Sequence, residues 1–109
     1  MALITIENTT LKSLQILYEG ELERANDFTY KEKESGASVS IHFDDDGISI
    51  IREADVKTSL HLYEKSKGEV LSIYGILPLE VERISYECLS HQIKVKYRIS
   101  DFFIFTITF

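Results

Sequence analysis

Apolar and polar side chains alternate in short runs along almost the whole chain, and this pattern limits the possible folds more than any other feature. The clearest run spans residues 92–99, where isoleucine, valine and tyrosine alternate with lysine and arginine. Side chains of a strand point to opposite faces in turn, whereas a helix repeats about every 3.6 residues. No stretch keeps a convincing helical repeat. The sequence therefore predicts an all-β protein of about eight to ten strands.

Turn-forming residues separate these runs at regular intervals. Asp46-Gly47 stands between the runs 38–43 and 48–52, and Asp-Gly at such a position is a strong signal for a β-hairpin. Ser100-Asp101 is expected to form a tight turn before the last run. Strands that follow one another about every 8–12 residues are typical of an antiparallel sandwich or barrel.

The only proline of the chain lies in a further alternating run, in which Leu77, Leu79 and Val81 share one face. Proline has no backbone N–H and cannot complete the hydrogen bonding of a central strand. We therefore expect Pro78 at the start of a strand or on a strand at the edge of a sheet.

The alternation also predicts which side chains share a face. In the run that begins at residue 14, Leu14, Ile16 and Tyr18 have the same parity. In the last run, three side chains are expected to point into the core together with those of the preceding run: Phe103, Phe105 and Ile107.

The last run, Phe102–Phe109, has no charged residue and would be an aggregation-prone edge if it were left unpaired. Closing a sheet into a barrel removes such edges, and consecutive hairpins then account for nearly all of the strand pairing. We therefore predict a single domain, residues 1–109, formed by an antiparallel up-and-down barrel in which this run is the closing strand.

Several short motifs follow one another along the chain: Tyr30-Lys31-Glu32 with Gly36, Asp46-Gly47 followed by Ile51-Arg52, the run 60–64, and Tyr74-Gly75-x-Leu77-x-Leu79-x-Val81. In this order they resemble the YwiB-like family of small bacterial proteins, from residue 14 to the end of the chain. The resemblance implies a lipocalin-like, calycin-type β-barrel and no established activity. The family has Thr-Pro before the Tyr-Gly pair, whereas this chain has Ser72-Ile73, so no role of that Thr-Pro pair carries over.

Charge and cysteine content narrow the range of partners and compartments. The 12 Lys and Arg against 18 Asp and Glu give a net charge of −6, which disfavours a nucleic-acid partner. Lys94, Lys96 and Arg98 are expected to form an outward stripe on one strand. Cys88 is the only cysteine, and neither a signal peptide at the start nor a long apolar run is apparent. These features predict a cytoplasmic protein that does not act at a membrane.

The segment 42–53 matches part of a calcium-binding loop, because acidic residues and a glycine fall at the positions where that loop needs them: Asp44, Asp46, Gly47 and Glu53. A histidine stands at the first ligand position, where a carboxylate oxygen is required. The runs on both sides are strand-like rather than helical. We therefore expect a solvated hairpin turn.

The histidines and the cysteine do not form a recognisable metal or catalytic motif. His42, His61 and His91 lack ligand spacing and are expected to be exposed. Cys88 has Glu87 beside it, which does not favour a reactive thiolate, and a structural thiol is expected. No metal, cofactor or catalytic residue is predicted.

Arg52 is the strongest candidate for a binding residue, because it shares the parity of Ile48 and Ile50 and should point inward or lie at the rim. An arginine there needs an anion or hydrogen-bond partners. It could contact the acidic head group of a fatty-acid-like ligand, with Tyr63 and Tyr74 nearby, or form a structural ion pair that closes one end of the barrel.

Three classes of function are compatible with these features. The first is a protein that binds a small apolar or amphipathic ligand inside the barrel. The second is a protein-interaction module that uses an exposed or terminal strand, for which a homo-oligomer is one form. The third is an enzyme whose site is assembled from scattered polar residues, although no enzyme motif is present. Binding is the preferred prediction, by analogy of fold.

Overall fold

The computed structural model describes residues 1–109 and consists of eleven β-strands. This confirms the predicted all-β class but exceeds the predicted count of about eight to ten strands, because the chain turns more often than the alternation alone indicated. No helix is long and apolar enough to cross a membrane. The strands, in chain order, are β1 (Ala2–Asn8), β2 (Ser13–Gly20), β3 (Asp27–Lys31), β4 (Ser38–Phe43), β5 (Ile48–Glu53), β6 (Lys57–Leu62), β7 (Lys67–Ser72), β8 (Gly75–Leu79), β9 (Glu82–Cys88), β10 (Gln92–Ile99) and β11 (Asp101–Thr108).

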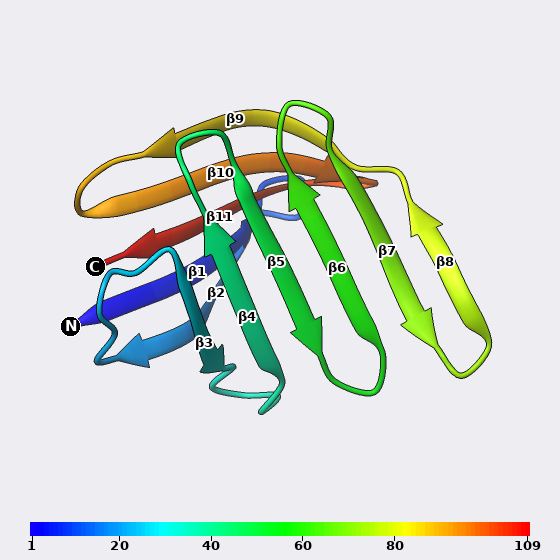
Figure 1. The fold of residues 1–109 in the computed structure, drawn as a ribbon, viewed down its shortest axis with the longest axis horizontal. Coiled ribbons are helices and arrows are strands. Elements are labelled where there is room, and N and C mark those ends of the chain that lie inside the picture. The colour runs from blue at the N-terminus through cyan, green and yellow to red at the C-terminus, as the bar shows by residue number, and fades with distance from the viewer.

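The strands form two antiparallel sheets whose directions cross in Figure 1. One sheet has the order β2-β1-β11-β10-β9, and the other has the order β3-β4-β5-β6-β7-β8. Every pairing joins strands that follow one another in the chain, except that β11 returns to β1. This is the strand order of an up-and-down barrel. However, no ladder joins β2 to β3 or β8 to β9, so the predicted closed barrel is opened at two seams.

The two seams differ in how the chain crosses from one sheet to the other. At the β2–β3 corner a single backbone hydrogen bond, 2.8 Å from Lys33 N to Leu17 O, connects the sheets. At the other seam β8 ends at Leu79, and Val81 packs against the core between the sheets. The alternating run around the proline is therefore interrupted by a change of sheet. Pro78 lies in β8, an edge strand, as predicted.

The core fills the space between the sheets and comes from the central strands of each. Phe105 and Ile107 point into it as predicted, and Phe103 packs against it. The largest fully buried side chains are Ile4, Val39, Phe43, Ile48, Leu62, Ile93, Val95 and Ile107. The last run is not an edge, because β11 is paired with β1 on one side and β10 on the other. Both sides of this strand are therefore hydrogen-bonded within the sheet, and no apolar edge is left free.

The predicted parity of β2 does not describe its inward face. Leu14 and Ile16 are 68% and 41% exposed, whereas Leu17 is buried in the core and Tyr18 packs against it. The ladder between β1 and β2 shifts register between Ile4 and Thr5, which makes Leu17 the additional residue of a β-bulge. A bulge reverses the face of the side chains beyond it, and alternation alone does not reveal where it lies.

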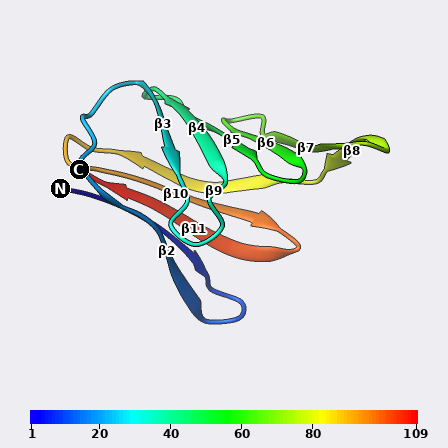
Figure 2. The ribbon, with the colours of Figure 1, turned by 90° about the horizontal axis from the view of Figure 1, so that it is seen from below.

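The sheets do not cover each other completely. In Figure 2, β8 and the adjoining end of β7 project sideways beyond the other sheet. The two most exposed large apolar side chains of the chain lie at this end of the second sheet: Ile73 and Tyr74.

Candidate functional site

An apolar pocket of about 120 Å³ lies between the two sheets. Apolar side chains from both sheets form most of its wall: Ile6, Leu17, Val39, Ile50, Leu60 and Phe105. The polar side chains that line it are Tyr30, Glu32, Arg52, Thr58 and Tyr97. An apolar pocket with a few convergent polar groups is the usual form of a small-molecule site.

Local strand geometry explains why charged side chains face this apolar space. Arg52 belongs to β5 and follows the inward alternation of Ile48 and Ile50, as predicted. Glu32 follows β3 directly and shares the parity of Phe28 and Tyr30. Both charged residues therefore lie on the inner face of the same sheet.

Glu32 and Arg52 form a two-pronged ion pair at the edge of the pocket. Arg52 Nε donates to Glu32 Oε2 at 2.8 Å, and Arg52 Nη2 donates to Glu32 Oε1 at 3.0 Å. Ser35 Oγ also donates to Glu32 Oε1, at 2.6 Å. Burial raises the pKa of Glu32, but the hydrogen bonds from Arg52 and Ser35 and the charge of Arg52 outweigh burial, so this pKa is below its ordinary value. Glu32 is therefore ionised at neutral pH.

Two buried tyrosines supply the uncharged polar groups of the pocket. Burial raises the pKa of both Tyr30 and Tyr97, and the neighbouring Glu32 charge raises that of Tyr30 further. Both phenols therefore stay protonated. They make no side-chain hydrogen bond, whereas Tyr18 and Tyr86 donate to backbone carbonyls. Since no fully buried polar side-chain atom lacks a partner, the hydroxyls of Tyr30 and Tyr97 are not fully buried, and both residues line the pocket.

The pocket adjoins an outer hollow of about 440 Å³ that shares Ile6, Leu17, Glu32 and Arg52 with it. Gln15, Glu34 and Ser35 complete the hollow. Because Glu32 and Arg52 neutralise each other, the charge of Glu34 leaves this entrance with an excess of one negative charge.

Of the three predicted binding residues, the structure places only Arg52 at the pocket. Tyr63 lies just beyond β6 in a separate polar surface groove with Arg83 and Tyr86. Tyr74 is in the turn between β7 and β8 and is almost fully exposed. Residues in turns have no parity, so the alternation could not place these two tyrosines.

Glu32 is the site residue that was not predicted. The sequence did contain a signal for it. Glu32 alternates in step with the apolar residues of its run, as Arg52 does with those of another run, so both side chains are expected to point inward. Two opposite charges on inward faces should be expected to meet, because buried charges are paired.

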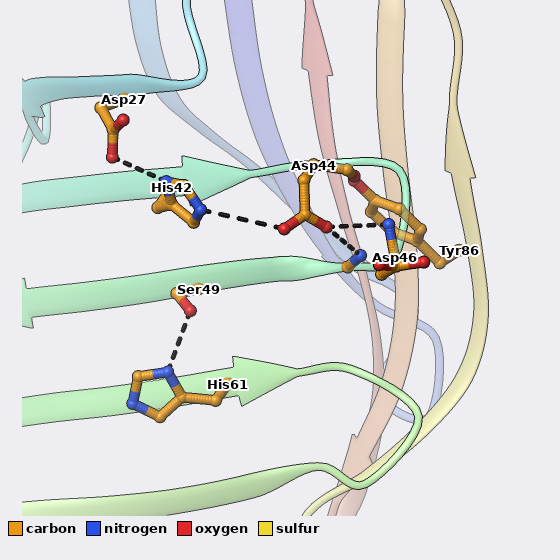
Figure 3. A network of polar contacts seen from close by, with 8 residues as sticks. Asp27, His42, Asp44, Asp46, Ser49, His61 and Tyr86 are labelled. Carbon is orange, nitrogen blue, oxygen red and sulfur yellow. Dashed lines mark hydrogen bonds and ion pairs between the residues drawn. The ribbon is translucent and has the colours of Figure 1, made fainter.

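The segment 44–47 is a hairpin turn between β4 and β5 (Figure 3). Asp44 Oδ1 accepts hydrogen bonds from Asp46 N at 2.8 Å and Gly47 N at 3.1 Å. Tyr86 Oη donates to the Asp44 carbonyl at 2.6 Å, which fastens the turn to the other sheet. The acidic residue that resembled a calcium ligand thus holds the turn, as the hairpin interpretation predicted.

Two histidines lie near one another on the outer face of the second sheet (Figure 3). His42 Nδ1 is 2.7 Å from Asp27 Oδ1, and its Nε2 is 3.9 Å from Asp44 Oδ2. His61 Nδ1 is 2.9 Å from Ser49 Oγ. No group of three or more His, Cys, Asp or Glu side chains is arranged to hold a metal ion.

Cys88 is a free, partly buried thiol near an arginine that the sequence did not associate with it. Arg24 Nη2 lies 3.7 Å from its sulfur, and the same guanidinium covers the rings of Phe43 and Phe109 at 5.1 and 5.5 Å. This arginine therefore holds the connection between β2 and β3 against the end of the core.

The basic stripe of β10 lies on the outer face of its sheet, as predicted. The side chains that alternate with it, Ile93, Val95 and Tyr97, are buried. Arg98 is paired with Glu82 at 3.1 Å. The stripe is thus partly neutralised by the neighbouring edge strand β9.

Comparison of the chain with family models, with curated proteins and with solved structures gives no match. The site is therefore interpreted from its own geometry.

Proposed function

We propose that this protein binds a small amphipathic molecule whose apolar part is about the size of one aromatic ring. The pocket between the sheets carries this proposal, because it combines an apolar wall with two tyrosine side chains and an ion pair. The apolar group would enter the pocket, and the polar end would remain in the outer hollow.

The size of the pocket limits the apolar part of the ligand. Its volume is about 120 Å³, whereas sites for drug-sized ligands have about 300–1,000 Å³. An apolar cavity of about 150 Å³ can hold benzene. A single ring or a short branched chain therefore fits, and the long chain of a fatty acid does not.

The charges at the entrance limit the polar part. Nε and Nη2 of Arg52 are engaged by Glu32, and Glu34 adds a negative charge at the entrance. An acidic head group would therefore meet the carboxylates of both Glu32 and Glu34 beside this arginine. A neutral or positively charged polar end is favoured over an acidic head group, which was one of the two alternatives for Arg52; the structural ion pair was the other.

The strand order supports the family resemblance as part of this proposal. All pairings follow the up-and-down sequence of a calycin-type barrel, and we propose that the chain is a YwiB-like protein in which that barrel is opened at its two seams. We further propose a cytoplasmic binding protein rather than an enzyme, since the pocket holds a mutually neutralised ion pair and two protonated phenols rather than a free nucleophile or base.

A series of ligands with the same ring and different charge tests the proposal. Benzylamine, benzyl alcohol and benzoate would be titrated into the protein, with binding followed by NMR shifts of the pocket amides and by the melting temperature. A ligand that binds only the folded state raises the melting temperature by mass action. Benzylamine or benzyl alcohol should bind more tightly than benzoate.

Two threonine substitutions provide the matched control. Thr58→Phe would fill the pocket and should abolish binding, whereas Thr106→Phe changes the outer face of the central strand β11 and should leave it intact. If none of the three ligands binds, or if Thr58→Phe leaves their affinity unchanged, the proposed function is wrong.

A further inference from the structure

The hairpin formed by β7 and β8 carries a concentration of exposed apolar side chains that the proposed pocket does not use. It projects beyond the other sheet in Figure 2. Its exposed residues are Leu71, Ile73, Tyr74, Ile76 and Leu77. Large contiguous apolar patches on a monomer usually mark an interaction site.

One row of side chains shows that the exposed patch continues the protein core. This row crosses five neighbouring strands, from β4 to β8, and its side chains share the inner face of the sheet. Its members are Val39, Arg52, Thr58, Val70 and Leu77. Val39 at one end is 1% exposed, whereas Leu77 at the other end is 63% exposed. The inner face therefore stays apolar after the opposing sheet has ended. A second apolar layer would complete it.

The free edge of β8 is unsuited to strand addition. In a hairpin with a two-residue turn, the residues that flank the turn form a hydrogen-bonded pair, here Ser72 and Gly75. Alternation then directs the main-chain groups of Ile76 and Pro78 to the free edge. Pro78 has no N–H to donate, so a row of donors is interrupted there. A partner is therefore expected to pack on the face of the hairpin and not along its edge.

The charge pattern indicates what kind of partner fits. Residues 70–79 contain no charged side chain, in a chain whose net charge is −6. The nearest lysine on the adjacent strand, Lys57, is 3.8 Å from Glu53. An ionic partner has no counter-charge to bind, and an anionic membrane would be repelled by the chain as a whole. A second copy can approach through this uncharged segment without bringing like charges together.

The available area is sufficient for a dimer. Ile73 and Tyr74 are 92% and 93% exposed. With Leu77 they offer roughly 450 Å² of apolar surface per copy, if each fully exposed side chain is counted at about 150–200 Å², the lower part of the range for aromatic side chains. Apolar atoms make up about 65% of homodimer interfaces, so two copies would bury roughly 1,400 Å² in total, within the range of stable complexes.

We propose that the protein forms a two-fold dimer in which the overhanging inner faces of the two β7–β8 hairpins pack on each other. The same patch serves both copies, as two-fold symmetry requires. Leu77 and the turn residues Ile73 and Tyr74 lie in the interface, and Ile76, on the opposite face of β8, lies outside it.

Two neighbouring residues give a matched test. Leu77 and Ile76 are 63% and 64% exposed and point to opposite faces of the same strand. Sedimentation equilibrium of the full chain should show a concentration-dependent monomer–dimer equilibrium. Leu77→Glu should weaken dimerisation by about 30-fold or more, because the interface would bury an unpaired carboxylate. Ile76→Glu should leave the dimerisation constant within about threefold of the original. Circular dichroism of both variants checks that they are folded.

Several outcomes would overturn the dimer. A wild-type chain that stays monomeric at high concentration contradicts it, and so does a stronger effect of Ile76→Glu than of Leu77→Glu. Binding of the monomer to vesicles of neutral phosphatidylcholine, without self-association, would assign the hairpin to a lipid surface instead. If Leu77→Glu fails to fold, Leu77→Ser replaces it under the same criteria.

Discussion

At the scale of single residues, the charged groups that line the apolar pocket form a pair. Glu32 is 9% exposed in its side chain, and Arg52 holds it from a position that is 38% exposed. Because the folded-state pKa of Glu32 is lowered, its ionised form stabilises the protein above the pKa of the unfolded chain. That stability is lost as the pH falls through the folded-state pKa.

Glu32→Gln is therefore expected to flatten the acid part of the stability profile. The unfolding free energy of the wild type should fall as the pH is lowered from about 5, near and below the ordinary pKa of a glutamate. The variant should lose less unfolding free energy at low pH, because it has no carboxylate at position 32 to be protonated. Urea unfolding at several pH values measures both slopes, and identical slopes would show that Glu32 does not titrate differently in the folded state.

Arg52→Met should cost about 1.5–3 kcal/mol of unfolding free energy at neutral pH, because Glu32 then loses the hydrogen bonds to its charge. The control is Lys57→Met, which breaks an exposed ion pair of 3.8 Å with Glu53 and should cost less than about 1 kcal/mol. Equal losses in the two variants would mean that the Arg52 pair is worth no more than a surface contact.

Gly47 is required by a close approach between hairpins. A Cβ atom at this position would lie 2.4 Å from Leu62 O and 2.7 Å from a ring carbon of Tyr63. Gly47→Ala should cost about 1–3 kcal/mol through overpacking. Gly36→Ala is the comparison, because its Cβ would meet nothing within 4 Å and only the positive φ of 72° opposes it, at about 1–2 kcal/mol. Thermal unfolding of both variants should rank Gly47→Ala as the less stable.

At the scale of secondary structure, β11 determines whether the first sheet exists. It is paired with β1 and with β10 along nearly its whole length. The strand therefore connects the N-terminal hairpin, β1 and β2, to the C-terminal hairpin, β9 and β10. An uncharged run of this kind is tolerated because it is central in the sheet and has no free edge.

Phe105 and Phe102 of β11 allow the strand's inner face to be tested against its outer face. Phe105 is buried in the core, whereas Phe102 is exposed. Phe105→Ala should cost about 3–5 kcal/mol of unfolding free energy, and Phe102→Ala less than about 1.5 kcal/mol, as measured by denaturant unfolding.

A chain that ends at Ser100 should be insoluble or unfolded, because it lacks the strand that joins both hairpins. A soluble truncation that unfolds cooperatively would contradict this role of β11.

At the scale of the whole molecule, the two sheets form one core that is closed unevenly. The β2–β3 corner is joined by a backbone hydrogen bond, whereas the hairpin of β7 and β8 extends beyond the opposing sheet. Stability should therefore be highest where both sheets overlap and lowest at the overhang.

Native-state hydrogen exchange measures this difference directly. Under dilute conditions that keep the protein monomeric, amides of Val95 and Ile107 should exchange only through global unfolding, since their side chains are fully buried. Amides at the tip of the β7–β8 hairpin, including Gly75, should exchange by local opening. Equal protection of the two regions would mean that the overhang is part of the same cooperative unit as the core.

More of the fold than of the candidate site can be predicted from the sequence. The β-strand content and the Asp46-Gly47 hairpin follow from patterns within a few residues, and so does the inward face of β10. The inward direction of Arg52 was available in the same way. Its partner Glu32 was not identified, because the ion pair joins segments twenty residues apart in sequence.

The sequence by itself determined the all-β class, the Asp46-Gly47 hairpin and the sequential order of pairing, because side-chain period and turn chemistry act locally. Only the tertiary structure decided that the sheets open at two seams, that Leu17 enters the core in place of Leu14 and Ile16, and that the β7–β8 hairpin is left uncovered. These features depend on bulges, on the crossing of the sheets and on where each sheet ends. Such long-range geometry is fixed by packing between segments that are distant in the chain, and the alternation within a segment does not encode it.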